Sequence, residues 1–308
     1  MLRATRIAVI AVLASTFAGL STTVRAQKSA GTFSSSPVAV APQYDTTHVY
    51  VNPSDVNAFV VSFLGTFGGT TTKQVAVTVT PTPSTTTSQL LQTPVGTVSL
   101  FGFTTPIPYP FGAERTGYLV SDMDAAIKAA RATGANVVVT PFPDPIGMDA
   151  VIQWPGGVMT QIYWHTTKPS YAPFARIPEN RVYLSADRAD PFLKSFLAFS
   201  NGHVVANTTH ASGIELGLSK GTVRRIQVES SFGKLLVFVT DGHLPYPYGR
   251  ETTGYEVGDL GATIIKASGL GVKILIPPHR VEDRSSAMVE FPGGYIAEIH
   301  STVASPNH

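Results

Sequence analysis

The sequence predicts an α+β protein built from tandem βαβββ modules, four units that form two lobes with cupped sheets. Three observations predict this fold: an internal repeat that covers most of the chain, strand and helix patterns that recur in the same order, and a composition typical of globular proteins. The chain has 308 residues, of which 43% are hydrophobic and 14% are charged. It is therefore long enough for two domains with cores of their own.

The N-terminus has the features of a secretory signal peptide. Arg3 and Arg6 precede an uncharged apolar run from Ile7 to Leu20, and Val24-Arg25-Ala26 places small residues at the two positions that a signal peptidase inspects. We therefore expect residues 1–26 to be removed and the mature protein to be exported, to the periplasm or outside the cell. An uncleaved membrane anchor is the alternative, but the apolar run is shorter than the ~20 residues that span a bilayer.

Charge and cysteine content narrow the classes of partner. The formal net charge is +2, and the predicted signal holds three arginines, so the remainder has 22 − 3 = 19 basic and 20 acidic residues. A nearly neutral mature chain gives no indication of nucleic-acid binding or, after signal removal, of membrane binding. The chain has no cysteine, so neither disulfides nor thiolate chemistry are expected.

An internal repeat is the strongest pattern in the chain. Residues 108–122 read PYPFGAERTGYLVSD and residues 245–259 read PYPYGRETTGYEVGD, with ten of fifteen positions identical at an offset of 137. Upstream the offset is 133, so that Val49-Tyr50 corresponds to Val182-Tyr183. We interpret the chain as two copies of one lobe. The predicted parts are a flexible linker at 27–44, a first lobe at 45–165, a second linker at 166–178 and a second lobe at 179–304.

Each lobe in turn contains two units of the same order. In the first unit we expect a strand at 48–51, a helix at 55–65, and strands near 74–79 and 95–103, with a long polar loop at 80–88. In the second unit Asp122 is typical of a helix N-cap and Gly134 of a helix end. Further strands follow at 117–120, 135–140, 150–153 and 158–164, and the helices of the second lobe are expected at 189–199 and 260–269.

These pieces resemble the vicinal-oxygen-chelate superfamily, which includes glyoxalases, bleomycin-resistance proteins, fosfomycin-resistance proteins and extradiol dioxygenases. The resemblance rests on TGYLVSDMDAAIKAARATGANVVV at 116–139, on WPGGVMTQIYW at 154–164, and on their counterparts at 253–276 and 291–301. It covers most of residues 45–302. It implies that paired βαβββ units form a cupped sheet around a site, and that this chain has two such cups.

The resemblance also implies where ligands of a divalent metal would lie: on the first strand of each unit and on the last strand of the lobe. In the first lobe these positions hold His48, Arg115 and Gln161, and in the second lobe Arg181, Thr252 and Glu298. Arginine has no acceptor for a metal, so neither set is a good metal site. His300 shares a strand face with Glu298, which leaves His48, Gln161, Glu298 and His300 as candidate ligands.

Each candidate has a second interpretation. His48 can be a satisfied core histidine, and Gln161 and Glu298 can line a cup and hold a water molecule. Arg115 and Arg181 can be surface cations, or they can bind a carboxylate or phosphate inside a cup. The PYP turns are either corners between units or aromatic rims of the cups.

Three functions are compatible with these patterns. The leading one is an exported, glyoxalase-like protein that binds a small organic ligand, neutral or anionic, without the usual metal triad and without a cofactor. The second is a lyase, isomerase or dioxygenase whose divalent metal is bound by a variant ligand set. The third is a structural or interaction module with both cups filled by side chains. The sequence does not decide whether the chain is an enzyme.

Overall fold

The computed structural model describes residues 38–39, 43–44, 47–113, 115–174 and 176–302, and it gives no side-chain placement for Arg115. The predicted signal peptide and most of the first predicted linker lie outside these residues. Within them, no helix is both long and apolar enough to cross a membrane.

The first half of the chain forms one mixed sheet with two helices. Its first unit comprises β1 (Thr47–Tyr50), η1 (Pro53–Asp55), α1 (Val56–Phe67), β2 (Thr70–Thr71), β3 (Val75–Val77), β4 (Thr86–Thr93) and β5 (Gly96–Phe103). Its second unit comprises β6 (Arg115–Leu119), α2 (Met123–Ala132), β7 (Asn136–Asp144), β8 (Gly147–Gln153) and β9 (Met159–His165).

The second half repeats this order. Its first unit comprises β10 (Glu179–Leu184), α3 (Ala186–Ser200), β11 (His203–Ser212), η2 (Gly213–Leu216), β12 (Thr222–Ser230) and β13 (Gly233–Val239). Its second unit comprises β14 (Glu251–Glu256), α4 (Leu260–Ser268), β15 (Lys273–Val281), β16 (Arg284–Phe291) and β17 (Tyr295–Thr302).

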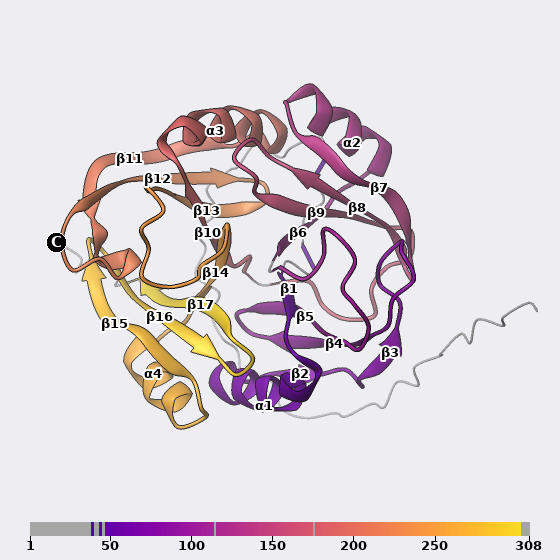
Figure 1. Cartoon of the computed structure of the whole chain (residues 1–308), viewed down its shortest axis with the longest axis horizontal. Coiled ribbons are helices and arrows are strands. Elements are labelled where there is room, and N and C mark those ends of the chain that lie inside the picture. The colour runs from indigo at the N-terminus through magenta and orange to yellow at the C-terminus, as the bar shows by residue number, and fades with distance from the viewer. Residues whose placement is uncertain (1–37, 40–42, 45–46, 114, 175, 303–308) are drawn as a thin grey trace, which may run out of the picture. The chain divides into compact units, whose positions relative to one another are not determined.

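The two sheets have the same topology. The first runs β2-β4-β5-β1-β6-β9-β8-β7, with β3 also paired to β4, and the second runs β11-β12-β13-β10-β14-β17-β16-β15. In each sheet the first strands of the two units pair antiparallel, β1 with β6 and β10 with β14. Figure 1 shows each sheet curled, with its helices on the outer face. The predicted α+β fold of tandem βαβββ modules is confirmed.

Side-chain caps begin the second helix of each half, α2 and α4, but not α1 or α3. The carboxylates of Asp122 and Asp259 accept hydrogen bonds from the backbone N–H groups of Ala125 and Ala262, at 2.7 and 2.9 Å, which satisfies donors that a helix start leaves free. Asp55 makes no such bond. The turn before α1 is capped instead by Asn52, whose Oδ1 accepts from the N–H of Ser54 at 3.0 Å.

The polar segment 80–88 is shorter as a loop than its composition predicts. Strand β4 begins at Thr86 and pairs along its whole length with β5. Threonine is β-branched and suits a strand, and Leu90 and Leu91 continue the strand beyond the polar run.

Described residues of the first predicted linker also pack on the sheet. Val38 is buried, and its carbonyl accepts from the N–H of Ser121 at 2.8 Å. The side-chain amide of Gln43 bonds both backbone groups of Leu119, at 3.1 and 2.7 Å. Strand β1 pairs with β6 only through Thr47 and His48. The side-chain amide of Gln43 therefore provides the hydrogen-bond partners of Leu119 that β1 does not provide.

The outer faces of the two sheets pack against each other through their central strands. Val49 of β1 and Tyr255 of β14 enter one apolar cluster with α1 and α4. Tyr118 of β6 and Val182 and Leu184 of β10 enter a second with α2 and α3. Large aromatic side chains fill both clusters; Tyr118 and Phe232, for example, have ring centroids 4.4 Å apart. The two cores therefore lie between the halves, and each half covers the outer face of the other.

A small polar row separates the two clusters at the centre of this contact. Thr116 donates to both carboxylate oxygens of Glu251, from its N–H at 3.0 Å and from its hydroxyl at 2.8 Å. The hydroxyls of Thr47 and Thr253 lie 3.4 Å apart, and the amide of Asn180 donates to the Thr116 hydroxyl. Thr47 and Asn180 are equivalent in the repeat, as are Thr116 and Thr253, so the halves are related by a pseudo-twofold axis through this row.

The two Pro-Gly-Gly hairpins also pack reciprocally. Gly156 of the first half lies against Leu184, where a Cβ would come within 2.6 Å of Cδ2. Gly293 of the second half lies against Val51, where a Cβ would come within 2.8 Å of Cγ1. Val51 and Leu184 are equivalent at the offset of 133. Each hairpin therefore needs glycine at the residue that contacts the opposite half.

Substitution of adjacent hairpin glycines separates this contact from backbone strain. Gly293 and Gly294 both have positive φ, +87° and +84°, but a Cβ at Gly294 would meet nothing within 4 Å. We expect Gly294→Ala to lower the free energy of unfolding by about 1–2 kcal/mol through strain alone. Gly293→Ala should cost a further ~1–3 kcal/mol through overpacking against Val51. Urea denaturation measures both values, and equal losses would contradict the interlocked packing.

Candidate functional site

The structure brings the predicted ligand positions together on the inner face of each sheet. In the first half His48 lies opposite Arg115 between β1 and β6, and Gln161 lies beside Gly117 between β9 and β6. In the second half Arg181 lies opposite Thr252, and Glu298 lies beside Gly254. The side chain of Arg115 lies outside the described residues, so its predicted role stays a prediction.

The first cup is lined by aromatic rings around a polar centre. His48 is buried and stacks parallel to Phe101, with ring centroids 5.9 Å apart and an interplanar angle of 4°. A Cβ on Gly117 would lie 2.9 Å from both His48 Cε1 and Tyr163 Cε1, so these two rings meet above this glycine. The amide nitrogen of Gln161 donates to Asp149 Oδ2 at 2.8 Å.

This arrangement does not match a metal site of the superfamily. The amide NH2 group of Gln161 donates to Asp149 and leaves its carbonyl oxygen as an acceptor, but His48 is the one imidazole among the three predicted ligand positions, and arginine holds another of them. No group of three His, Cys, Asp or Glu residues suited to a metal ion occurs within the described part of the chain. His165, further along β9, lies near Tyr163 with ring centroids 5.3 Å apart. Burial lowers its pKa, and Asp144 opposes this shift.

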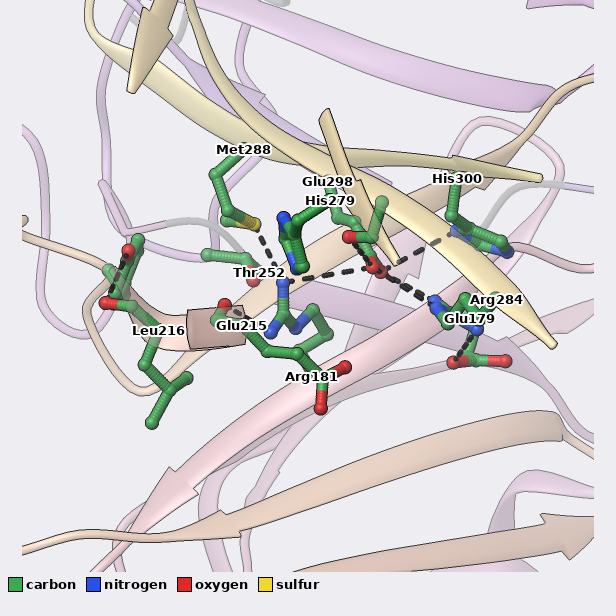
Figure 2. A network of polar contacts seen from close by, with 12 residues as sticks. Glu179, Arg181, Glu215, Leu216, Thr252, His279, Arg284, Met288, Glu298 and His300 are labelled. Carbon is green, nitrogen blue, oxygen red and sulfur yellow. Dashed lines mark hydrogen bonds and ion pairs between the residues drawn. The ribbon is translucent and has the colours of Figure 1, made fainter. Parts of the chain in front are cut away.

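The second cup holds a buried network of charged side chains, drawn in Figure 2. Arg181 is fully buried, and its Nη1 lies 3.8 Å from Glu298 Oε1. The same nitrogen donates to the sulfur of Met288, and Nη2 donates to the backbone carbonyl of Glu215, both at 2.7 Å. The guanidinium carbon lies 4.7 Å from the ring centroid of Phe238.

Glu298 is the carboxylate on which most of this network converges. Arg284 binds it with two nitrogens, Nη2 to Oε2 at 2.6 Å and Nε to Oε1 at 3.2 Å. Ser286 donates to Oε1, and His300 Nδ1 lies 3.5 Å from Oε2. Burial alone would raise the pKa of Glu298, but Arg284, Arg181 and His300 outweigh it and hold the pKa well below its ordinary value.

Two further carboxylates balance the remaining charge. Arg284 also pairs with Glu179 at 2.8 Å. Glu215, carried into the cup by η2, lies 3.1 Å from Nε of Arg225, and burial raises its pKa against the opposing effect of Arg181 and Arg225. Three buried or nearly buried guanidinium groups thus face three carboxylates. Arg181 was a candidate anion binder, but its charge is already engaged by carboxylates of the same chain.

Apolar side chains fill the rest of the second cup. Tyr248, from the PYPYG turn, stacks on Tyr183 with ring centroids 5.0 Å apart and donates its hydroxyl to the carbonyl of Leu216 at 3.1 Å. The hydroxyl of Tyr183 lies 2.8 Å from that of Thr252, so Thr252 is engaged as well. Tyr248 of the PYPYG turn therefore closes this cup from inside.

A metal does not fit the second cup. Glu298 is the one carboxylate at the three predicted positions, and it already faces two guanidinium groups and an imidazole. A divalent cation beside it would lie close to two fixed positive charges. His300 contacts Glu298 as predicted, but this pair belongs to the ionic network.

A cavity of about 420 Å³ lies between the two halves, at the ends of both cups. Its walls come in equivalent pairs from the two copies of the repeat: Pro110 with Pro247, Gly157 with Gly294, and Met159 with Ile296. The cavity therefore lies close to the pseudo-twofold axis. The remaining lining residues are Tyr50, Tyr109, Ala113, Tyr248, Gly249, Arg250, Glu251, Thr252 and Tyr295.

Two charged residues at this cavity differ in their surroundings. Glu251 is buried and accepts two hydrogen bonds from Thr116, as described above. Arg250 is exposed, and its guanidinium group makes no ion pair or hydrogen bond with any residue that the structure describes. The sequence equivalent of Arg250 in the first half is Ala113, so among the described side chains the guanidinium group lies on one side of the cavity only.

Sequence reasoning missed Glu179, Glu215, Arg225, Arg250 and Arg284. Along β16 the alternate positions 284 and 286 hold Arg284 and Ser286, which are polar side chains on the inner face of the sheet. This alternation was one usable signal in the sequence. No local pattern marks Glu215, because η2 interrupts the connection between β11 and β12. The lining of the cavity comes from segments 137 residues apart.

Solved structures share this fold. A triple mutant of 4-hydroxymandelate synthase from Streptomyces coelicolor superposes with a TM-score of 0.61 at 13% identity, over 89% of this chain and 95% of that one. The 2,3-dioxygenase LapB from Pseudomonas sp. KL28 gives 0.53 at 11%, over 86% and 93%. The Mn(II)-bound glyoxalase from Novosphingobium aromaticivorans gives 0.50 at 13%, over 87% and 82%.

These proteins belong to the vicinal-oxygen-chelate superfamily, and the predicted resemblance is confirmed at the level of the fold. At such identities the likeness shows the fold alone. No model of a protein family matches the chain, and no curated protein matches it either.

Titration of Glu298 tests the ionic network. We expect Glu298→Gln to lower the free energy of unfolding by about 3–5 kcal/mol at pH 7, because buried Arg181 loses the carboxylate it pairs with and Arg284 keeps only Glu179. A carboxylate with a depressed folded-state pKa stabilises above its ordinary pKa of 4.5 and ceases to do so as the pH falls through the folded value. The difference between the two proteins should therefore shrink below pH ~4.5.

Urea denaturation of both proteins between pH 3 and pH 7 measures this difference. Glu256→Gln serves as the control, since Glu256 pairs with the exposed Arg176 and should contribute at most about 1 kcal/mol. A difference that stays constant with pH would rule out a charged Glu298 as the origin.

Proposed function

We propose that this chain, which has the vicinal-oxygen-chelate fold, binds a small organic molecule in the cavity between its two halves and does so without a metal. The observation that carries the proposal is the cavity itself. Its volume of about 420 Å³ lies within the range of small-molecule sites, and an apolar, aromatic lining with few polar groups is typical of them.

The lining suits a flat organic molecule. Tyr50 and Tyr109 line the cavity with aromatic rings, and Gly157 and Gly294 let a ligand approach the hairpin backbone. Met159 adds a flexible apolar contact. Tyr109 is 78% exposed, so a ligand that covers this ring removes apolar surface from water, which favours binding.

Arg250 indicates that the ligand carries an anionic group. A guanidinium group that has no ion pair with the described residues and lies at the edge of an apolar cavity can bind a carboxylate through two parallel hydrogen bonds. The anion preference that the sequence suggested for Arg115 and Arg181 is thus better supported at Arg250. The ligand would place its apolar body among the tyrosines and its charged end at this side chain.

The alternatives differ in what supports them. A metal-dependent lyase, isomerase or dioxygenase agrees with the fold, and one structure of this fold holds Mn(II), but the residues at both predicted metal positions do not suit a cation. A purely structural role agrees with the filled second cup. It does not account for the cavity or for Arg250, which has no ion pair with any described residue.

A thermal-shift screen with small aromatic and aliphatic carboxylates tests ligand binding. A ligand that binds only the native state stabilises it by about 2.7 kcal/mol at a hundredfold excess over its dissociation constant. This stabilisation raises the melting temperature. We expect Arg250→Ala to weaken binding of a carboxylate tenfold or more, as expected for loss of a charged hydrogen-bonded pair worth about 1.5–3 kcal/mol. Met159→Trp should abolish it by filling the cavity.

Arg131→Ala, an exposed change on α2, serves as the matched control and should leave binding unchanged. Equal affinity of the wild-type and Arg250→Ala proteins would contradict the assigned anion contact. Mass spectrometry of protein purified without chelator should find well under one equivalent of transition metal per chain. Stoichiometric metal, lost together with an activity on His48→Ala or Glu298→Gln, would favour the enzyme instead.

We further propose that the chain is exported and loses residues 1–26. The support is the uncharged apolar run after Arg3 and Arg6 and the small residues at the expected cleavage site. N-terminal sequencing of protein from its native host should begin at or near Gln27. An intact Met1 on soluble protein inside the cell would refute export.

A further inference from the structure

The guanidinium group of Arg181 lies where the inner-face positions of β10, β14 and β17 meet (Figure 2). By the resemblance described above, these three positions hold the metal ligands in active members of the superfamily. Here the first position supplies a cation of its own. The second supplies a hydroxyl engaged by Tyr183, and the third supplies the carboxylate that faces the guanidinium.

One side chain thereby contacts four other elements of the second half. Arg181 extends from β10 and reaches Met288 on β16, Glu298 on β17, the carbonyl of Glu215 on η2, and the ring of Phe238 on β13. A bound metal also draws ligands from separate strands toward one point. The guanidinium does so with several donors in one plane, which stay protonated in proteins.

The positive charge next to Glu298 equals that of a divalent cation. Arg181 and Arg284 each contribute one positive charge, at 3.8 Å and 2.6 Å from its oxygens. Both guanidinium groups and the carboxylate are largely or fully buried, so solvent does not screen them.

We propose that the guanidinium group of Arg181 replaces the divalent cation of the second cup. It is a covalently attached counter-cation that draws β10, β17 and η2 together. The second half is then a closed scaffold that needs no metal. This inference does not depend on the ligand proposed for the cavity between the halves.

The first experiment removes the cation. Arg181→Met keeps an apolar side chain of similar length, Arg181→Lys keeps the charge without the planar donors, and Arg176→Ala removes an exposed guanidinium as the control. We expect the melting temperature to fall by roughly 6–20 °C for Arg181→Met, by less for Arg181→Lys, and by at most ~3 °C for the control. An Arg181→Met protein within ~3 °C of the wild type overturns the proposal.

The second experiment returns a metal. The double variant Arg181→His/Thr252→His places two imidazoles beside Glu298, a ligand set that suits Zn²⁺. We expect Zn²⁺ at a hundredfold excess over its dissociation constant to raise the melting temperature of the double variant by roughly 5–10 °C. Chelator should reverse the effect, and the wild type and Arg176→Ala should not respond.

Should the double variant not fold alone, the yield of folded protein on refolding with and without Zn²⁺ becomes the readout. Zn²⁺-dependent recovery supports the proposal. A double variant that gains neither stability nor yield from Zn²⁺ overturns it. So does a wild-type protein that Zn²⁺ stabilises to the same extent.

Discussion

The contact between the outer faces of the two sheets is the constraint on which the rest of this structure depends. A curled sheet with two helices leaves apolar side chains of its central strands uncovered, and burial of that surface is the largest favourable contribution to folding. Here β1 and β14 bury theirs with α1 and α4, and β6 and β10 with α2 and α3. This packing fixes the pseudo-twofold axis, and with it the interlocked hairpins and the cavity at the ends of the cups.

The inner faces of the two sheets differ, although the outer faces pack in equivalent ways. The first cup keeps an aromatic lining around His48 and the Gln161–Asp149 pair. In the second cup a tyrosine-bearing turn, a short helix and six charged side chains occupy the interior. The same fold therefore supports two interiors of different chemistry, as expected where function depends on sites within a fold and not on the fold itself.

The sequence predicted what depends on local chemistry and on the repeat. Asp122 and Asp259 cap helices because a short acceptor binds free N–H groups in any context, and the offset of 137 required two sheets of one topology. The strand β4 was missed where threonines suggested a loop, because pairing with β5 decided its conformation. The contacts of Arg181 with Glu215 and Met288 could not be predicted from the sequence. They form only when η2 and β16 pack against β10 in the folded protein. The cavity likewise exists only once the two halves have packed.

The difference between Ala113 and Arg250 has a consequence for how the cavity presents itself to a ligand. In a symmetric dimer of identical chains, a molecule on the twofold axis meets every wall residue twice, and an arginine at this position would confront a copy of itself. Joining the two copies in one chain removes that restriction, because each copy can change alone. Among the described residues, the cavity consequently has the guanidinium group of Arg250 on one side and the methyl group of Ala113 on the other. A molecule with one polar terminus can enter it in a single orientation, which a true homodimer could not specify.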